Sequence, residues 1–280
     1  PDGPLPGIRL VGINGVALGA AQPSLEARRT LAQLLTNTTG KRVVLHLNDK
    51  FILDGSRTLA VKPVSRGDAF VLYYEAWQAW QRQLVHKLSQ GRLGYVHIEG
   101  MDDPSLRHFK HHLGNDALGR EGLVIDVRFN GGGYTAVDVL EILIKRPWLI
   151  RRNREARDVS ENAYRSITLE KPSVLMINQD SFSNAEILAE GYRRLGIGKI
   201  VGVDTAGGVI GTGGFRLIDG SSMRLPGTGA YALDGENLEN SGRKPDLFVE
   251  NHPEELDKGI DRQTEAAVTT LLEQLDSKGK

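Results

Sequence analysis

The fold of this chain is decided by the stretch Leu123-Val124-Ile125-Asp126-Val127-Arg128-Phe129-Asn130-Gly131-Gly132-Gly133, in which a mostly apolar run stops at three glycines. A short, nearly continuous apolar run is typical of a strand that is buried on both faces. Consecutive glycines allow unusual φ angles, and a helical pattern begins directly after them, at Thr135. The stretch therefore predicts a buried strand, a tight loop and a helix N-terminus.

The same alternation continues along the chain on both sides of this stretch. Further apolar runs occupy 94–98, 173–177 and 199–203, and amphipathic helical patterns occupy 104–113, 135–145 and 184–195. Strand and helix in repetition predict an α/β fold with right-handed crossovers. A hairpin at 215–225 and an amphipathic helix at 267–275 complete this half of the chain.

The N-terminal part has a different texture. Short strand-like runs with turn residues between them fill 7–64, including a turn at Asn14-Gly15, and a helix is expected from Ser24 to Gly40. Apolar residues that recur every three or four positions then predict a long amphipathic helix over 68–90. We expect a β-rich domain at 1–66, a linking helix at 67–91 and an α/β domain at 92–280.

Composition excludes several classes of protein. The chain has 280 residues, 40% of them apolar and 25% charged, and no run approaches the ~20 apolar residues of a membrane span. Lys plus Arg and Asp plus Glu balance at 35 each, which leaves no net charge to attract nucleic acid. The absence of cysteine excludes thiolate metal sites and cysteine nucleophiles. Catalysis would therefore use Ser, Thr, His or carboxylates, and we expect no metal or cofactor.

The glycine loop is the first candidate site. In an α/β sheet, chemistry gathers at the carboxyl ends of the strands, where this loop lies. Backbone N–H groups beside a helix N-terminus suit an anion or a developing oxyanion. A tight strand-to-helix turn without further function is the alternative. The spacing matches neither a dinucleotide fingerprint nor a phosphate-binding loop.

A second candidate is the serine pair after the run 173–177. A serine at a strand-to-helix junction presents its hydroxyl at the catalytic edge of the sheet, and the N–H of Asn184 lies in the first turn of the following helix. Ser181 or Ser183 could instead cap that helix, with Glu186 completing a capping box. Residue type alone leaves both interpretations open.

A serine nucleophile needs a base, and seven histidines are present. His97 lies in a buried strand, where a histidine can also be an ordinary core residue. His108 and His112 are spaced for a metal, but no carboxylate near them has ligand spacing, so they are interpreted as surface. The polar loop 238–246 contains Glu239, which could orient a base.

These motifs, taken in order, give a resemblance to a known family. The segments at 94–98, 127–133, Ser183, 196–211 and 239–246 resemble the catalytic part of the tricorn protease family, a branch of the tail-specific, C-terminal-processing serine peptidases. Upstream, 7–64 resembles most of a PDZ domain and 68–90 the linking helix. The resemblance implies a crotonase-like catalytic domain after a partial PDZ-like domain, and peptides as substrates.

The resemblance also implies roles for individual residues. Ser183 would be the nucleophile, His97 the general base and Glu239 the carboxylate that polarises it, with Ser241 as a relay hydroxyl. The backbone N–H groups that would hold the oxyanion belong to Asn184 and to Gly132 or Gly131.

Two departures from the family pattern refine these expectations. The processing peptidases use a lysine base that is missing from Thr205-Ala206-Gly207-Gly208, which leaves His97 as the base. Tricorn has an aspartate after the nucleophile, which favours basic P1 side chains, where this chain has the neutral Asn184; we therefore expect apolar or small P1 residues, with Asp234 and Glu236 as the acidic groups that could change this.

The chain begins at Pro1 without Met and without the family's β-propellers, so we interpret it as part of a longer protein. We expect a cytoplasmic location, no nucleic-acid or membrane partner, and a homo-oligomer formed through the missing N-terminal domains. Two alternatives to a peptidase remain. One is a non-catalytic, PDZ-bearing scaffold that binds peptides, and the other is an acyl-CoA enzyme of the crotonase type.

Overall fold

The computed structural model describes residues 8–18, 30–115, 117, 119–146, 169 and 171–278. It divides into two compact units, 1–77 and 78–280, and the boundary falls inside the long helix α2 (Arg66–Leu88). Among the described residues, no helix has the length and apolar character needed to span a membrane.

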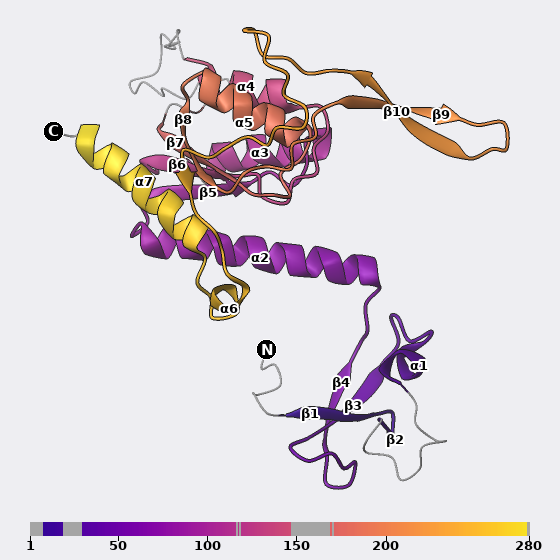
Figure 1. Ribbon diagram of the computed structural model, residues 1–280. Coiled ribbons are helices and arrows are strands. Elements are labelled where there is room, and N and C mark those ends of the chain that lie inside the picture. Colours follow the sequence, from indigo (N-terminus) through magenta and orange to yellow (C-terminus); the bar gives the residue numbers. More distant parts are fainter. Residues whose placement is uncertain are drawn as a thin grey trace, which may run out of the picture. The chain divides into compact units, whose positions relative to one another are not determined.

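The first unit is built on a four-stranded antiparallel sheet (Figure 1). The strand order is β2-β1-β3-β4, and the helix α1 follows β2 in the chain. The bounds are β1 (Arg9–Ile13), β2 (Val16–Ala17), α1 (Leu31–Leu35), β3 (Val43–Asn48) and β4 (Arg57–Val61). Asn14 and Gly15 both have positive φ, at 48° and 80°, as the tight turn of a two-residue hairpin requires. The turn expected at Asn14-Gly15 is confirmed.

Helix α1 is shorter than the sequence predicts. The expected start at Ser24 lies outside the described residues. The helix is capped by Thr30, whose hydroxyl accepts from the N–H of Gln33, and it ends at Leu35 rather than near Gly40. Thr36 has ψ of 129° and Asn37 has φ of 59°, so the backbone leaves the helix there. Gly40, with φ of 74°, lies in a later turn.

The linking helix α2 is present almost as predicted, but only its second half is buried. Gln81 and Val85 are buried, whereas Phe70 and Tyr73 in the first half are 67% and 78% exposed. The apolar spacing therefore predicted the helix correctly and its buried face only in part. Gln90 and Gly91, with φ of 52° and 79°, turn the chain from α2 into the first strand of the second unit.

The second unit is a five-stranded parallel sheet covered by helices on both faces (Figure 1). The strand order is β11-β8-β7-β6-β5, which confirms the α/β class. The strands are β5 (Leu93–His97), β6 (Gly122–Asp126), β7 (Ser173–Ile177), β8 (Gly198–Gly202) and β11 (Leu247–Phe248). The sequence analysis did not predict β11, a two-residue strand that pairs with Val201 and Gly202 of β8.

Successive residues of the central strands face opposite layers, which explains why the strands are apolar throughout. Leu123 and Ile125 pack beneath one group of helices, and Val124 packs beneath the other. The helices α3 (Asp103–Asn115), α4 (Ala136–Ile144) and α5 (Asn184–Arg194) cover the first face. The second half of α2 and the C-terminal helix α7 (Arg262–Lys278) cover the second. The short helix α6 (Pro253–Leu256) precedes α7.

A two-stranded hairpin extends from this unit (Figure 1). It consists of β9 (Gly211–Arg216) and β10 (Ser222–Thr228), and every residue in both strands is exposed. Met223 pairs with Phe215, and because residues two apart share a face, Leu217 and Leu225 lie on the same side. The hairpin expected at 215–225 is confirmed, with longer strands than predicted.

Candidate active site

The candidate residues gather at the carboxyl edge of the parallel sheet. His97 is the last residue of β5 and pairs with Asp126, the last residue of β6. The glycine loop follows β6, and Ser183 follows β7, the next strand along. The parallel order therefore places all three segments at one edge, as the sequence analysis expects.

The structure distinguishes the two serines. Ser181 is fully buried, and its hydroxyl donates to the Val127 carbonyl at 2.9 Å and accepts from the N–H of Asn178 at 3.0 Å. Ser183 is half-buried and has φ of 56° and ψ of −115°. A non-glycine residue with positive φ is uncommon, and such strained backbone concentrates at functional sites. Ser181 is thus a structural residue, whereas Ser183 occupies a sharp elbow between loop and helix.

The glycine loop lies directly against this elbow. A Cβ atom placed on Gly132, whose φ is 93°, would lie 2.6 Å from the Cβ of Ser183 and 3.0 Å from the backbone nitrogen of Asn184. Only glycine permits this approach. The structure therefore brings Gly132, Ser183 and Asn184 together.

The N–H groups of these residues differ in their acceptors. The N–H of Gly132 donates to Oδ1 of Asn130 at 2.9 Å. Among the described residues, the N–H groups of Gly131 and Asn184 have no acceptor. Asn184 is the first residue of α5, where an N–H has no intrahelical partner and the helix dipole is positive.

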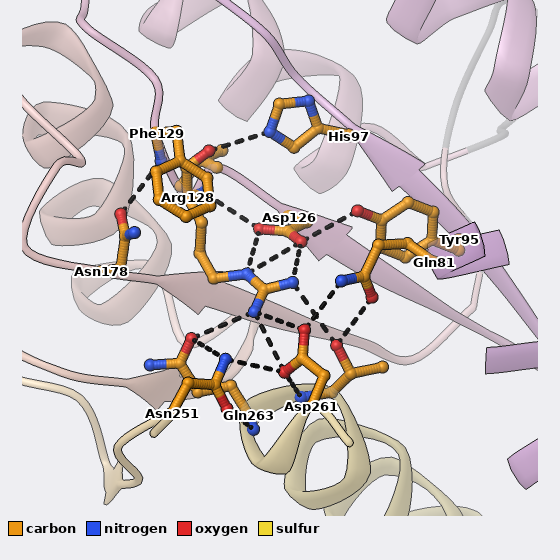
Figure 2. Close-up of polar contacts among 12 residues, drawn as sticks. Gln81, Tyr95, His97, Asp126, Arg128, Phe129, Asn178, Asn251, Asp261 and Gln263 are labelled. Carbon is orange, nitrogen blue, oxygen red and sulfur yellow. Dashed lines mark hydrogen bonds and ion pairs between the residues drawn. The ribbon is translucent and has the colours of Figure 1, made fainter. Parts of the chain in front are cut away.

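His97 is 7% exposed, and its Nε2 lies 2.9 Å from the Arg128 carbonyl (Figure 2). Because a carbonyl only accepts, Nε2 carries the proton in the neutral ring. Burial lowers the pKa of His97 below its ordinary value, and the nearby charge of Asp126 opposes this only in part. The ring is therefore held neutral, the state that a general base requires.

Behind the base lies a buried ion network that sequence reasoning missed (Figure 2). The Arg128 guanidinium pairs with Asp126 at 2.7 Å and with Asp261 at 2.9 Å, and all three side chains are at most 2% exposed. Tyr95 donates its hydroxyl to Asp126 at 2.9 Å. In the sequence, this network is indicated only by a carboxylate and a guanidinium within an apolar run. Its third member, Asp261, directly precedes helix α7 and is 133 positions from Arg128.

Glu186 links the serine elbow to the loop that follows β8. This fully buried carboxylate accepts from the N–H of Ser183 at 3.0 Å, which supplies the returning half of a capping box. It also accepts from the Thr205 hydroxyl at 2.6 Å and from the N–H groups of Gly207 and Gly208 at 2.7 and 2.9 Å. Ser183 is therefore the N-cap residue of α5, and its role as the nucleophile stays a prediction.

Glu239 lies in the segment between β10 and β11 and contacts the end of that loop. Its Oε2 accepts from the N–H groups of Val209 and Ile210 at 2.6 and 2.8 Å. Ser241 is exposed, and its carbonyl accepts from Arg243 at 2.7 Å. The roles of Glu239 and Ser241 in polarising His97 stay predictions.

The acidic residues considered for specificity are already engaged. Asp234 and Glu236 both pair with Arg194, each at 2.8 Å. The side-chain oxygen of Asn184 accepts from the N–H of Ala136 at 2.8 Å, at the start of α4. Across the described parts of the chain, no group of three or more His, Asp or Glu residues is arranged to hold a metal ion.

Comparison with known proteins shows the family of the chain. The model of peptidase family S41 matches residues 92–249, which include His97, Ser183 and Glu239. The chain is 36% identical over 248 residues to tricorn protease homolog 1 of Streptomyces coelicolor, a match that covers 87% of this chain and 22% of that protein. It is 30% identical over 275 residues to the tricorn protease of Thermoplasma volcanium, which covers 96% of this chain and 25% of that one.

Among solved structures, the crystal structure of the tricorn protease superposes with a TM-score of 0.76 at 28% identity. The match covers 96% of this chain and 25% of that chain. The chain thus spans 22% and 25% of the lengths of the two curated relatives described above.

Proposed function

Because the chain belongs to peptidase family S41, we propose that it forms the catalytic part of a serine peptidase that hydrolyses peptide bonds through an acyl-enzyme. The observation that carries the proposal is the elbow at Ser183, with its positive φ and the Gly132 backbone against it. A half-buried serine in this position presents its hydroxyl beside backbone donors, which is the arrangement that acyl transfer needs.

In the proposed mechanism the Ser183 hydroxyl attacks the peptide carbonyl. His97 takes the proton and returns it to the leaving amine, and the resulting acyl-enzyme is hydrolysed by water. The buried His97 is neutral at physiological pH because burial lowers its pKa, so it is ready to accept this proton. Nδ1 is the ring nitrogen that takes this proton, because Nε2–H donates to the Arg128 carbonyl. For Glu239 to polarise the base, with Ser241 as the relay hydroxyl, that hydroxyl would take the place of the Arg128 carbonyl at Nε2.

The oxyanion is held by backbone N–H groups. Asn184 supplies one from the first turn of α5, where the helix dipole adds to the attraction. We assign the second to Gly131 rather than Gly132, because the N–H of Gly132 already donates to Asn130.

We also propose a domain organisation, a substrate class, a location and an assembly for the protein. We propose that 92–280 is a crotonase-like catalytic domain, that 1–66 is a partial PDZ-like domain, and that 67–91 links them. The four-stranded antiparallel sheet with α1 supports the second of these. Peptides are the proposed substrates, the cytoplasm is the proposed location, and a homo-oligomer is the proposed assembly.

The experiment is covalent labelling with a peptidyl phosphonate, followed by mass spectrometry of the adduct. We expect the label on Ser183, and we expect Ser183→Ala to lose both the label and roughly six orders of magnitude in turnover. Ser222→Ala, a change at an exposed serine of the hairpin, is the matched control and should keep both. An intact wild-type chain that neither labels nor cleaves peptides would favour the non-catalytic scaffold instead.

A further inference from the structure

Asn130 is a fully buried polar residue that the proposed mechanism does not use. It lies between β6 and the three glycines, and three different segments converge on it. Its Nδ2 donates to the carbonyl of Ile98 at 2.8 Å, and its Oδ1 accepts from the N–H of Gly132 at 2.9 Å. Its backbone carbonyl accepts from the N–H of Phe182 at 2.9 Å.

Each of these bonds ends beside a member of the proposed catalytic group. Ile98 directly follows His97 in the chain, and Phe182 directly precedes Ser183. Gly132 lies against the Cβ of Ser183. One residue therefore ties together the strand that carries the base, the loop that surrounds the oxyanion and the elbow that carries the nucleophile.

We infer that Asn130 is a positioning residue that sets the separation between His97, the glycine loop and Ser183; this inference rests on the proposed peptidase function. Proton transfer and oxyanion stabilisation depend on reacting groups being held to within about 0.5 Å, and a displacement of about 1 Å costs roughly 100-fold in rate. Asn130 controls that distance through two side-chain bonds and one backbone bond, without touching the substrate.

The chemistry of the two partners requires a carboxamide. The Ile98 carbonyl needs a donor and the Gly132 N–H needs an acceptor, and Asn130 supplies one of each from a short side chain. An ionised aspartate would keep the bond to Gly132 but would present a negative charge to the Ile98 carbonyl. An alanine would leave both backbone groups unpaired in a buried site.

The experiment measures kcat and KM on a peptide substrate for Asn130→Ala and Asn130→Asp, with folding checked by circular dichroism. For Asn130→Ala we expect kcat to fall about 100-fold with KM within about twofold of wild type, because geometry rather than binding is lost. Asn48→Ala is the matched control. The Asn48 carboxamide also donates to backbone carbonyls, those of Ile52 and Asp54, and accepts from a backbone N–H, but it belongs to the first unit, whereas the proposed site belongs to the second.

Asn130→Asp gives an independent readout if the alanine variant does not fold. The buried carboxyl should have a raised pKa, and once protonated it can donate to the Ile98 carbonyl as the carboxamide does. The ratio of variant to wild-type kcat should therefore rise as the pH falls from about 8 to 6. A merely structural role does not predict this recovery.

The outcomes separate cleanly. A wild-type chain without activity removes the proposed function and this inference with it. An active wild type together with an Asn130→Ala variant that keeps kcat within about threefold, or an Asn130→Asp ratio that does not rise on acidification, overturns the inference and leaves the peptidase proposal standing.

Discussion

Removing Asp261, which directly precedes helix α7, should destabilise the second unit more than removing a surface carboxylate of that helix. Asp261 accepts from Arg128 at 2.9 Å, from Gln81 at 2.7 Å and from Asn251 at 3.0 Å, and its side chain is 1% exposed. The change Asp261→Asn replaces the carboxylate with an uncharged carboxamide. One of the two oxygens that accept these bonds is thereby replaced by an NH2 group, which only donates. Arg128 keeps only Asp126 as an anionic partner in the network.

The magnitude follows from burial. Breaking a buried ion pair typically costs about 3–5 kcal/mol when the remaining charge is left uncompensated. Arg128 keeps Asp126 at 2.7 Å, so we expect Asp261→Asn to cost at least the roughly 2 kcal/mol that the depressed pKa of Asp261 implies. Asp276, near the end of α7, pairs with Arg92 at a similar distance of 2.7 Å, but its side chain is 63% exposed. Exposed pairs contribute about 0–1 kcal/mol, so Asp276→Asn should have little effect. The two variants change the same residue type in one helical region and differ mainly in burial.

The assay is urea unfolding followed by circular dichroism, with the midpoint and the slope compared between variants. We expect a midpoint shift for Asp261→Asn that corresponds to at least about 2 kcal/mol, with the slope unchanged. Equal shifts for Asp261→Asn and Asp276→Asn would refute the reasoning, because burial could not then be the cause.

The pH dependence gives a second test of the same network. Burial alone raises the pKa of Asp261, but the charge of Arg128 and the hydrogen bonds from Thr264, Gln81 and Asn251 outweigh it and lower that pKa from 3.8 to about 2. Because the folded-state pKa is depressed, this contribution is fully present above the unfolded value near 4 and is lost as the pH falls through about 2. The shift corresponds to roughly 2 kcal/mol, and this part of the acid dependence should be missing in Asp261→Asn.

The remaining predictions concern activity. The acid limb of kcat/KM should lie below pH 6.5, since burial lowers the pKa of His97; a pH profile checks this, and a limb above pH 7 would contradict it. Gly132→Ala should lower kcat by at least about 100-fold, because the new Cβ would lie 2.6 Å from that of Ser183. A variant with wild-type kcat would show that the glycine loop can shift to accommodate the methyl group. Apolar or small P1 residues should be preferred, because the Asn184 carboxamide is neutral; a P1 library that strongly favours Arg or Lys would disprove this.

The local sequence determined the main elements of the second unit. The short apolar runs at 94–98 and 173–177 are β5 and β7, and the helical pattern at 135–145 is α4. This succeeded because strands buried on both faces and amphipathic helices leave a pattern in adjacent residues. The strand β11 was not predicted, because the run Leu247-Phe248-Val249 is too short to identify a strand, and it becomes one through pairing with β8.

The sequence also located the segments of the candidate site, because side chains that follow parallel strands meet at one edge. It left open whether Ser181 or Ser183 is exposed. The tertiary structure decides this, because the hydroxyl of Ser181 is buried and donates to the Val127 carbonyl, whereas Ser183 is half-buried at the elbow. Two serines separated by one residue have no sequence pattern that distinguishes their burial.

What only the tertiary structure decided is the set of bonds between residues far apart in the chain. Arg128 and Asp261 are 133 positions apart, and Asn130 joins Ile98 across 32 positions. Glu186 reaches Thr205 and Gly208 across the strand β8. Such bonds depend on which segments the sheet order brings together. The sequence by itself therefore determined where the chemistry lies along the chain, whereas the packing of distant segments determined how the groups are held, because hydrogen-bond geometry is set by position in space and not by local residue type.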